Sequence, residues 1–310
     1  MAGELILITG GTGLIGIKTI HTALKAGYSV RAAVRSQAEA NAVLAAPTVK
    51  AINPGDKQTF VIVPDILADN AYDEAVKGSE LIAPAIKGTT SILTAAYKTP
   101  GIKRIVIASS AVAIIPWEEF IAKEVDTVFD DTYEIPFPQS PCPSRDQGIS
   151  QREEAEWDVI NIMPSFVGDN EMITDPKLIS DGTVSAAFTQ VLGGDSGWGA
   201  VPSTSIHPAD IARLHVEALD PKIEGNHSFL AVSEGQRGTR WEEAIEIVNC
   251  SFPEAVKKGF LPNNGPATTK RTKVESSRTE KVFGFKFQSY EEQVKSVVKQ
   301  YLGLLGEPVA

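Results

Sequence analysis

Residues 8–16 read ITGGTGLIG and continue a short apolar run, Leu5–Ile8. A continuous apolar run of this length is typical of a strand buried on both faces of a parallel sheet. The glycines stand three residues apart: Gly10 permits a tight turn, Gly13 lets backbone approach a ligand, and Gly16 lets a helix pack closely. The stretch therefore predicts a strand, a turn and a helix whose first N–H groups face a phosphate.

Strands and helices alternate along the sequence that follows. Further strands are predicted at residues 28–34, 59–63, 103–108 and 157–163, and helices at 14–26, 36–45, 70–77 and 85–98. Residues 47–57 are interpreted as a loop. Only one apolar run, residues 81–83, is available for a strand between the last two helices, and it is very short. The alternation predicts the α/β class, with a Rossmann-type doubly wound parallel sheet.

The spacing of the elements loosens after Gly168, which indicates a smaller C-terminal substrate lobe. We expect residues 1–168 to form the nucleotide-binding Rossmann domain, with residues 205–220 returning to it, and residues 169–310 to form the substrate-binding lobe. Two capping-box spacings predict helix starts, Thr239 with Glu242 and Ser289 with Glu292. An apolar stripe on the last helix predicts core packing and comprises Tyr290, Val294, Val297 and Tyr301.

Composition limits the partners and the compartment. The formal net charge of −10 argues against nucleic acid, because phosphate contacts need a basic surface. No window of about 20 apolar residues predicts a membrane span, and the N-terminal residues lack a signal-peptide pattern. Two cysteines suit a reducing compartment, so we expect a cytoplasmic protein. We expect it to be a monomer or a homodimer. His207 and His215 lack carboxylate or cysteine companions at ligand spacing, so no metal site is expected.

The segment after the second predicted strand indicates which dinucleotide binds. Residues 30–36 read VRAAVRS and contain no acidic residue that could accept a hydrogen bond from the ribose 2′-hydroxyl of NAD. Arg35 stands where a guanidinium could pair with a 2′-phosphate, which favours NADP(H). The alternative is a solvated arginine at a strand end. Asp65, after the third strand, is a candidate contact to the adenine amine, or a helix cap.

Together these segments resemble the extended short-chain dehydrogenase/reductase family, and most of all its dihydroflavonol reductase, cinnamoyl-CoA reductase and fungal aldehyde/ketone reductase group. The matching segments are residues 9–16 (TGGTGLIG), 30–35 (VRAAVR), 64–66 (PDI), 83–93 (APAIKGTTSIL), 107–111 (IASSA), 163–167 (MPSFV) and 205–219 (SIHPADIARLHVEAL). The resemblance covers nearly the whole chain.

The resemblance implies NADP(H)-dependent reduction of a small aldehyde or ketone, or oxidation of the matching alcohol. The residues that it places at the cofactor are Gly10, Thr12, Gly13, Leu14, Ile15, Gly16, Arg35, Asp65, Ile66, Pro164 and Val167. Ser110 corresponds to the serine that orients the substrate oxygen; its alternative role is to cap a backbone group at a strand end.

The sequence departs from the family pattern at the proton donor. The family uses a tyrosine whose pKa is lowered by a lysine four residues later, and none of the six tyrosines here is followed by such a lysine. Both this loss and the thin fourth strand fall in contiguous blocks, whereas scattered substitutions are expected from drift. We therefore hypothesise that segments are missing from the chain. Tyr133 is the nearest substitute, but it lies in an irregular, proline-rich stretch.

Two further functions stay open. A chain that binds NADPH without turnover could serve as a sensor of NADPH, and the absent tyrosine–lysine pair favours that interpretation. A defective product that binds little cofactor is favoured by the thin fourth strand.

Overall fold

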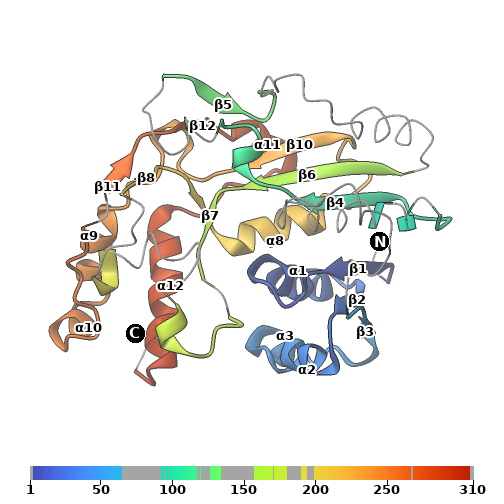
Figure 1. The fold of residues 1–310 in the computed structure, drawn as a ribbon, viewed down its shortest axis with the longest axis horizontal. Helices are drawn as coiled ribbons and strands as arrows, with labels where there is room; N and C mark the ends of the chain where they lie inside the picture. The colour runs from blue at the N-terminus through green and yellow to red at the C-terminus, as the bar shows by residue number, and fades with distance from the viewer. Residues whose placement is uncertain are drawn as a thin grey trace, which may run out of the picture.

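The computed structural model describes residues 3–64, 92–93, 95–96, 98–116, 119, 126–133, 157–169, 171–179, 190–193, 199–266 and 268–307. Six of the strands form two parallel three-stranded sheets (Figure 1). The first has the order β1-β2-β3, with β1 at Leu5–Thr9, β2 at Ser29–Val34 and β3 at Gln58–Ile62. The second has the order β10-β6-β4, with β4 at Arg104–Ala108, β6 at Asp158–Pro164 and β10 at His227–Ala231. The predicted α/β class with parallel strands is confirmed.

The first sheet is assembled from consecutive strands and helices. Helix α1 spans Leu14–Lys25, α2 spans Gln37–Ala45 and α3 spans Pro47–Ile52, and a 3₁₀ turn follows at Gly55–Lys57. The loop predicted at residues 47–57 was therefore wrong. Proline suits the first position of a helix, where its fixed φ is helical and its missing N–H has no partner to lose. Asn53 then ends α3 in the left-handed conformation.

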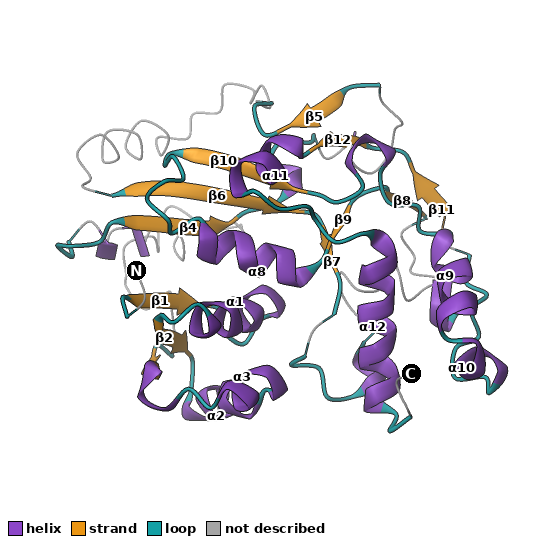
Figure 2. Ribbon diagram, turned by 180° about the vertical axis from the view of Figure 1, so that it is seen from behind, coloured by secondary structure: helices purple, strands orange, loops and turns teal. Residues whose placement is uncertain are grey.

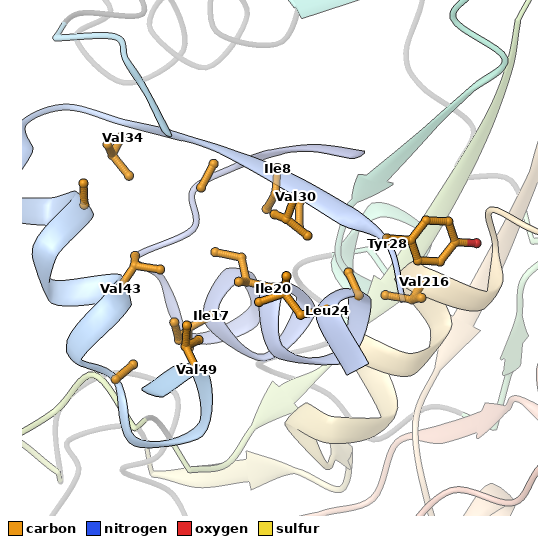
Figure 3. Close-up of a cluster of buried hydrophobic side chains, with 14 residues drawn as sticks. Ile8, Ile17, Ile20, Leu24, Tyr28, Val30, Val34, Val43, Val49 and Val216 are labelled. Carbon is orange, nitrogen blue, oxygen red and sulfur yellow. The ribbon is translucent and has the colours of Figure 1, made fainter. Parts of the chain in front are cut away.

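The core of this unit lies between α1, α2, α3 and the sheet (Figure 3). Ile17 and Ile20 of α1 are fully buried against Val30 and Ala32 of β2. Val216, from much later in the sequence, belongs to the same cluster. This long-range contact ties the first unit to the rest of the molecule.

Within the described residues, β1 and β4 are edge strands of the two sheets. Among the residues described, no backbone hydrogen bond joins β1 to β4. An ion pair connects the residues that precede the two strands, with Lys103 Nζ 2.8 Å from Glu4 Oε1. Leu5 and Leu7 of β1 are 55% and 57% exposed, although an interior strand of a doubly wound sheet buries both of its faces. The strand predicted at residues 81–83, the helix at 70–77 and most of that at 85–98 lie outside the described residues.

Elements beyond residue 168 complete the second sheet. Helix α8, Pro208–Glu217, packs on α1, β4 and β6, and β10 pairs with β6 (Figure 2). Two elements from beyond the expected boundary at residue 168 therefore belong to the sheet layers, and the division into two lobes stays a prediction.

Short strands and four helices form the remainder of the described chain. The parallel strand pairs are β5 (Val128–Asp130) with β12 (Lys273–Glu275), β7 (Phe166–Val167) with β9 (Ser205–Ile206), and β8 (Ala200–Pro202) with β11 (Thr268–Lys270). The helices are α9 (Glu243–Ser251), α10 (Pro253–Lys257), α11 (Ser277–Phe283) and α12 (Tyr290–Leu304). Within the described ranges, no helix is both long enough and apolar enough to cross a membrane.

One predicted capping box is confirmed and the other is wrong. Ser289 caps α12 with the reciprocal Glu292 contact in place, and Tyr290, Val294 and Val297 are buried as the stripe predicts. Thr239 instead lies fully buried, with its hydroxyl 2.6 Å from that of Ser205. Helix α9 begins at Glu243, and its N-cap Glu242 makes no side-chain capping hydrogen bond, while the Thr239 hydroxyl is bonded to Ser205 of β9.

Candidate cofactor-binding and active site

The glycine-rich turn between β1 and α1 is built almost entirely from backbone. Gly10 has a φ of +67°, a conformation that favours glycine, and its carbonyl accepts a 2.9 Å hydrogen bond from Gly13 N. A Cβ on Gly16 would lie 2.1 Å from Gly10 O. Gly16 is thus required because α1 passes against the turn itself. A Cβ on Gly11, which the sequence reading left out, would lie 2.8 Å from Ile20 Cδ1.

The N-terminus of α1 fits a pyrophosphate. Gly13 is the N-cap, no side chain caps the helix, and the first turn contains no acidic residue. The first N–H groups of a helix lack intrahelical partners, and together with the helix dipole they favour an anion. Thr12, Leu14 and Ile15 are half-buried beside the turn, so the protein leaves this face to backbone donors.

Arg35 follows β2 and is held by an acidic residue from the next helix. The guanidinium donates from Nε to Glu39 Oε1 at 2.8 Å, and Nη2 lies 2.5 Å from the same oxygen. The Arg35 backbone N–H donates to Glu39 Oε2 at 2.8 Å. These contacts, the backbone hydrogen bond first, hold the pKa of Glu39 below its usual value. Glu39 lies outside the strand-end segment 30–36 in which an acidic residue is expected, and the first turn of α2 folds it back to the strand end.

Ser110 lies two residues beyond the C-terminal end of β4, a strand of the second sheet. Its Oγ accepts a 3.4 Å hydrogen bond from Val112 N and caps the 3₁₀ turn Ala111–Ala113. The capping role considered for this serine is therefore present, and its role toward substrate stays a prediction. Pro164 is buried at the end of β6, and Val167 is buried in β7. Asp65 and Ile66 lie outside the described residues.

A charged cluster fixes the segment after Val167 against α1. Lys18 Nζ lies 3.2 Å from Asp169 Oδ2 and 3.8 Å from Glu171 Oε1. Glu171 also accepts hydrogen bonds from Thr48 N at 3.1 Å and Thr48 Oγ1 at 2.7 Å. The segment expected beside the nicotinamide is thus tied to the helix expected beside the phosphates. No motif in the sequence indicated this cluster.

The two histidines of the α8 region are buried and structural. His207 is the N-cap of α8, with Nδ1 accepting from Ala209 N at 3.1 Å, and its Nε2 lies 3.9 Å from Asp169 Oδ1. His215 Nδ1 lies 2.8 Å from Ile211 O. Burial lowers the pKa of both imidazoles. In the chain as described, no cluster of three or more histidine, cysteine or acidic residues could hold a metal ion.

Tyr133 packs as a core residue. Its ring lies edge-on to Phe129, with centroids 4.9 Å apart, in a cluster that also includes Ala111 and Met163. Residues 134–156, where the family's tyrosine and lysine are expected, lie outside the described residues.

Comparisons with known proteins agree with the fold and the motifs. Residues 2–115 match the model of the NmrA-like family. The ketoreductase CTB6 of Cercospora nicotianae is 32% identical, with 98% of this chain and 96% of the relative covered. The NAD-dependent epimerase/dehydratase ALT6 of Alternaria alternata is 30% identical, with coverages of 96% and 98%.

Solved structures show the same fold over the full length. Yeast methylglyoxal/isovaleraldehyde reductase Gre2, complexed with NADPH, superimposes with a TM-score of 0.74 at 18% identity, covering 98% of this chain and all of the other. Vestitone reductase from alfalfa superimposes with a TM-score of 0.66 at 20% identity, with coverages of 98% and 99%. On the sequence relatives and this fold, the chain belongs to the extended short-chain dehydrogenase/reductase family.

Proposed function

We propose that this chain binds NADP(H) and belongs to reductases that act on the carbonyl group of a small aldehyde or ketone, or on the matching alcohol. The observation that carries the proposal is the turn at residues 10–16, where the helix N-terminus is left to backbone donors. Relatives named as ketoreductases and a similar fold solved with NADPH support it. The expected substrate lobe, residues 169–310, would supply substrate contacts.

Each proposed contact combines the family resemblance with the position of a residue. The α1 N-terminus would bind the pyrophosphate, Arg35 the 2′-phosphate, and Pro164 and Val167 the nicotinamide end. Bound NADPH supplies the hydride in this family. The Ser110 hydroxyl would orient the substrate oxygen by donating its proton in a hydrogen bond, because a carbonyl oxygen can only accept, and the bond from Val112 N to Oγ occupies a lone pair and not the O–H.

A second candidate function, cofactor binding without turnover, is favoured by one observation. The alignment with the Cercospora relative extends over 344 positions, whereas this chain has 310 residues, so at least 34 positions have no counterpart here. This difference supports the hypothesis of missing segments. Loss of the proton donor alone is expected to cost about 10²–10⁴-fold in rate.

One experiment separates these functions. Purified protein is titrated with NADPH by cofactor fluorescence, and a panel of aldehydes and ketones is then added while NADPH oxidation is followed. Binding with turnover supports the reductase, and binding without turnover supports the second candidate. Absence of binding would overturn both. Sequencing the transcript tests the missing segments directly, because a message that encodes this chain in full would contradict an incomplete sequence.

A further inference from the structure

A positive side chain, Arg35, and a negative side chain, Glu39, lie together at the C-terminal end of β2. Dinucleotide sites use side chains of these two kinds to distinguish NADP from NAD. Arg35 suits a 2′-phosphate, and a carboxylate at this place accepts a hydrogen bond from the 2′-hydroxyl of NAD. Ala33 pairs with Thr9, so the chain leaves β2 beside the glycine turn that follows β1. Glu39, folded back by the first turn of α2, brings its carboxylate to the same strand end.

We infer that Glu39 is a specificity-determining residue that opposes Arg35, so that the chain binds NADH nearly as well as NADPH. This inference rests on the proposed NADP(H) site. The carboxylate contacts both Nε and Nη2 of Arg35 through one oxygen, which leaves only the far end of the guanidinium for a phosphate. A 2′-phosphate bound there would meet a neutralised cation with a negative charge close behind it.

Glu39 also holds Arg35 in place, and this positioning acts in the opposite direction. An exposed ion pair contributes little, and Arg35 is 75% exposed, so the positioning gain is about twofold in affinity. In water, repulsion between a carboxylate and a doubly charged phosphate that contact the same guanidinium is worth about tenfold in affinity. Repulsion is therefore the larger effect.

Glu39 has a structural role that the test must keep separate. Its backbone N–H donates to the N-cap Ser36 Oγ at 3.3 Å, and its side chain accepts from the backbone of Arg35. Glu39→Gln keeps an oxygen acceptor at this position and removes only the charge. A merely structural role would change the affinities for NADPH and NADH by the same factor.

The test is calorimetric titration of the full chain and its variants with NADPH and with NADH. We expect Kd values within about tenfold of each other for the unaltered chain. Glu39→Gln should tighten NADPH about tenfold and leave NADH within about twofold, and the NADPH gain should shrink at high salt. Arg35→Ala should weaken NADPH by at least about tenfold and spare NADH.

The matched control is Glu217→Gln on α8, which removes the same charge from another arginine pair with i,i+4 spacing, where Arg213 Nε lies 2.6 Å from Glu217 Oε1. It should leave both Kd values unchanged. An unchanged or weakened preference for NADPH in Glu39→Gln overturns the inference and leaves the proposed function standing. Failure of the unaltered chain to bind either cofactor overturns both.

Discussion

The two three-stranded sheets of this protein differ in how their parts are brought together. The sheet β1-β2-β3 and its helices come from one continuous segment, residues 3–64, and its candidate phosphate-binding turn is made of backbone. The sheet β4-β6-β10 collects strands from residues 104, 158 and 227, and its chemistry depends on side chains from distant segments. A local backbone site survives changes elsewhere in the chain, whereas a site assembled from distant side chains is lost when one segment is absent.

The largest effect is expected at the glycine turn of the first unit. Gly16→Ala places a Cβ 2.1 Å from Gly10 O, which is backbone and cannot move aside cheaply. We expect cofactor affinity to fall by at least about 100-fold, and the free energy of unfolding to fall by about 2–4 kcal/mol. Titration and urea denaturation measure the two losses.

The matched control is Gly303→Ala in α12, where an added Cβ meets nothing within 4 Å. It should raise the free energy of unfolding by about 0.5–1 kcal/mol and leave affinity unchanged. If Gly16→Ala and Gly303→Ala changed cofactor affinity and the free energy of unfolding equally, the close approach of α1 to the turn would not be what requires Gly16.

Removing a fully buried isoleucine from each unit tests whether the two units unfold together. Ile20→Ala in α1 and Ile162→Ala in β6 should each cost about 2–5 kcal/mol. Because Val216 of α8 lies in the core around Ile20, we expect one cooperative transition.

The tryptophans make this measurement specific to one unit. All four lie after residue 116 in the sequence, at positions 117, 157, 198 and 241, so we expect their fluorescence to follow the part of the chain after residue 116, while circular dichroism follows the whole chain. Ile20→Ala should shift the fluorescence midpoint in urea as far as the circular dichroism midpoint. A fluorescence transition that Ile20→Ala leaves in place would mean that the unpaired β1–β4 edge separates two independent units.

The sequence predicts the first unit well because its signals are local. The apolar run at Leu5–Ile8, the glycine spacing and the start of α1 each depend on neighbours within a few residues. The errors arise where a side chain acts over a distance. Thr239 has cap spacing but pairs with Ser205, and Glu39 acts on a residue four positions earlier across a turn.

The site shows the same contrast. The backbone contacts at Gly10 and Gly16 are possible because glycine has no Cβ, and the sequence alone identifies a glycine. The charged cluster around Lys18 joins residues 18, 48, 169 and 171, and no local pattern links them.

The next effect is the dependence of the free energy of unfolding on pH, which we expect to come mainly from the second unit. Burial lowers the pKa of His215, whose Nε2 has no hydrogen-bond partner among the described residues. Below pH 6.5 the unfolded chain therefore binds a proton that the folded chain does not, so the free energy of unfolding falls as pH falls. His207 and His21 have pKa values lowered by burial and act in the same direction.

His215→Met should reduce the fall in the free energy of unfolding between pH 6.5 and 5.5 by up to about 1 kcal/mol. Urea denaturation at pH 8.0, 6.5 and 5.5 measures it, with the value at pH 8.0 correcting for any change in packing. Parallel pH profiles for the variant and the unaltered chain would mean that His215 protonates without cost, through an opening of α8.

The smallest expected effects are the losses in unfolding free energy when the helix cap of each unit is removed. Ser289 caps α12, a helix of 15 residues that buries several side chains in the core of the later unit. Ser36 caps α2, which has 9 residues and buries only Ala40 and Val43. Ser289→Ala should cost about 1 kcal/mol and Ser36→Ala about 0.5 kcal/mol, because a short helix at the surface can fray locally instead of weakening the whole fold. Urea midpoints measure the cost, and hydrogen exchange locates it. A larger global loss for Ser36→Ala would indicate that α2 is integral to the first unit, and that the cap at the end of β2 stabilises the cofactor-binding edge as a whole.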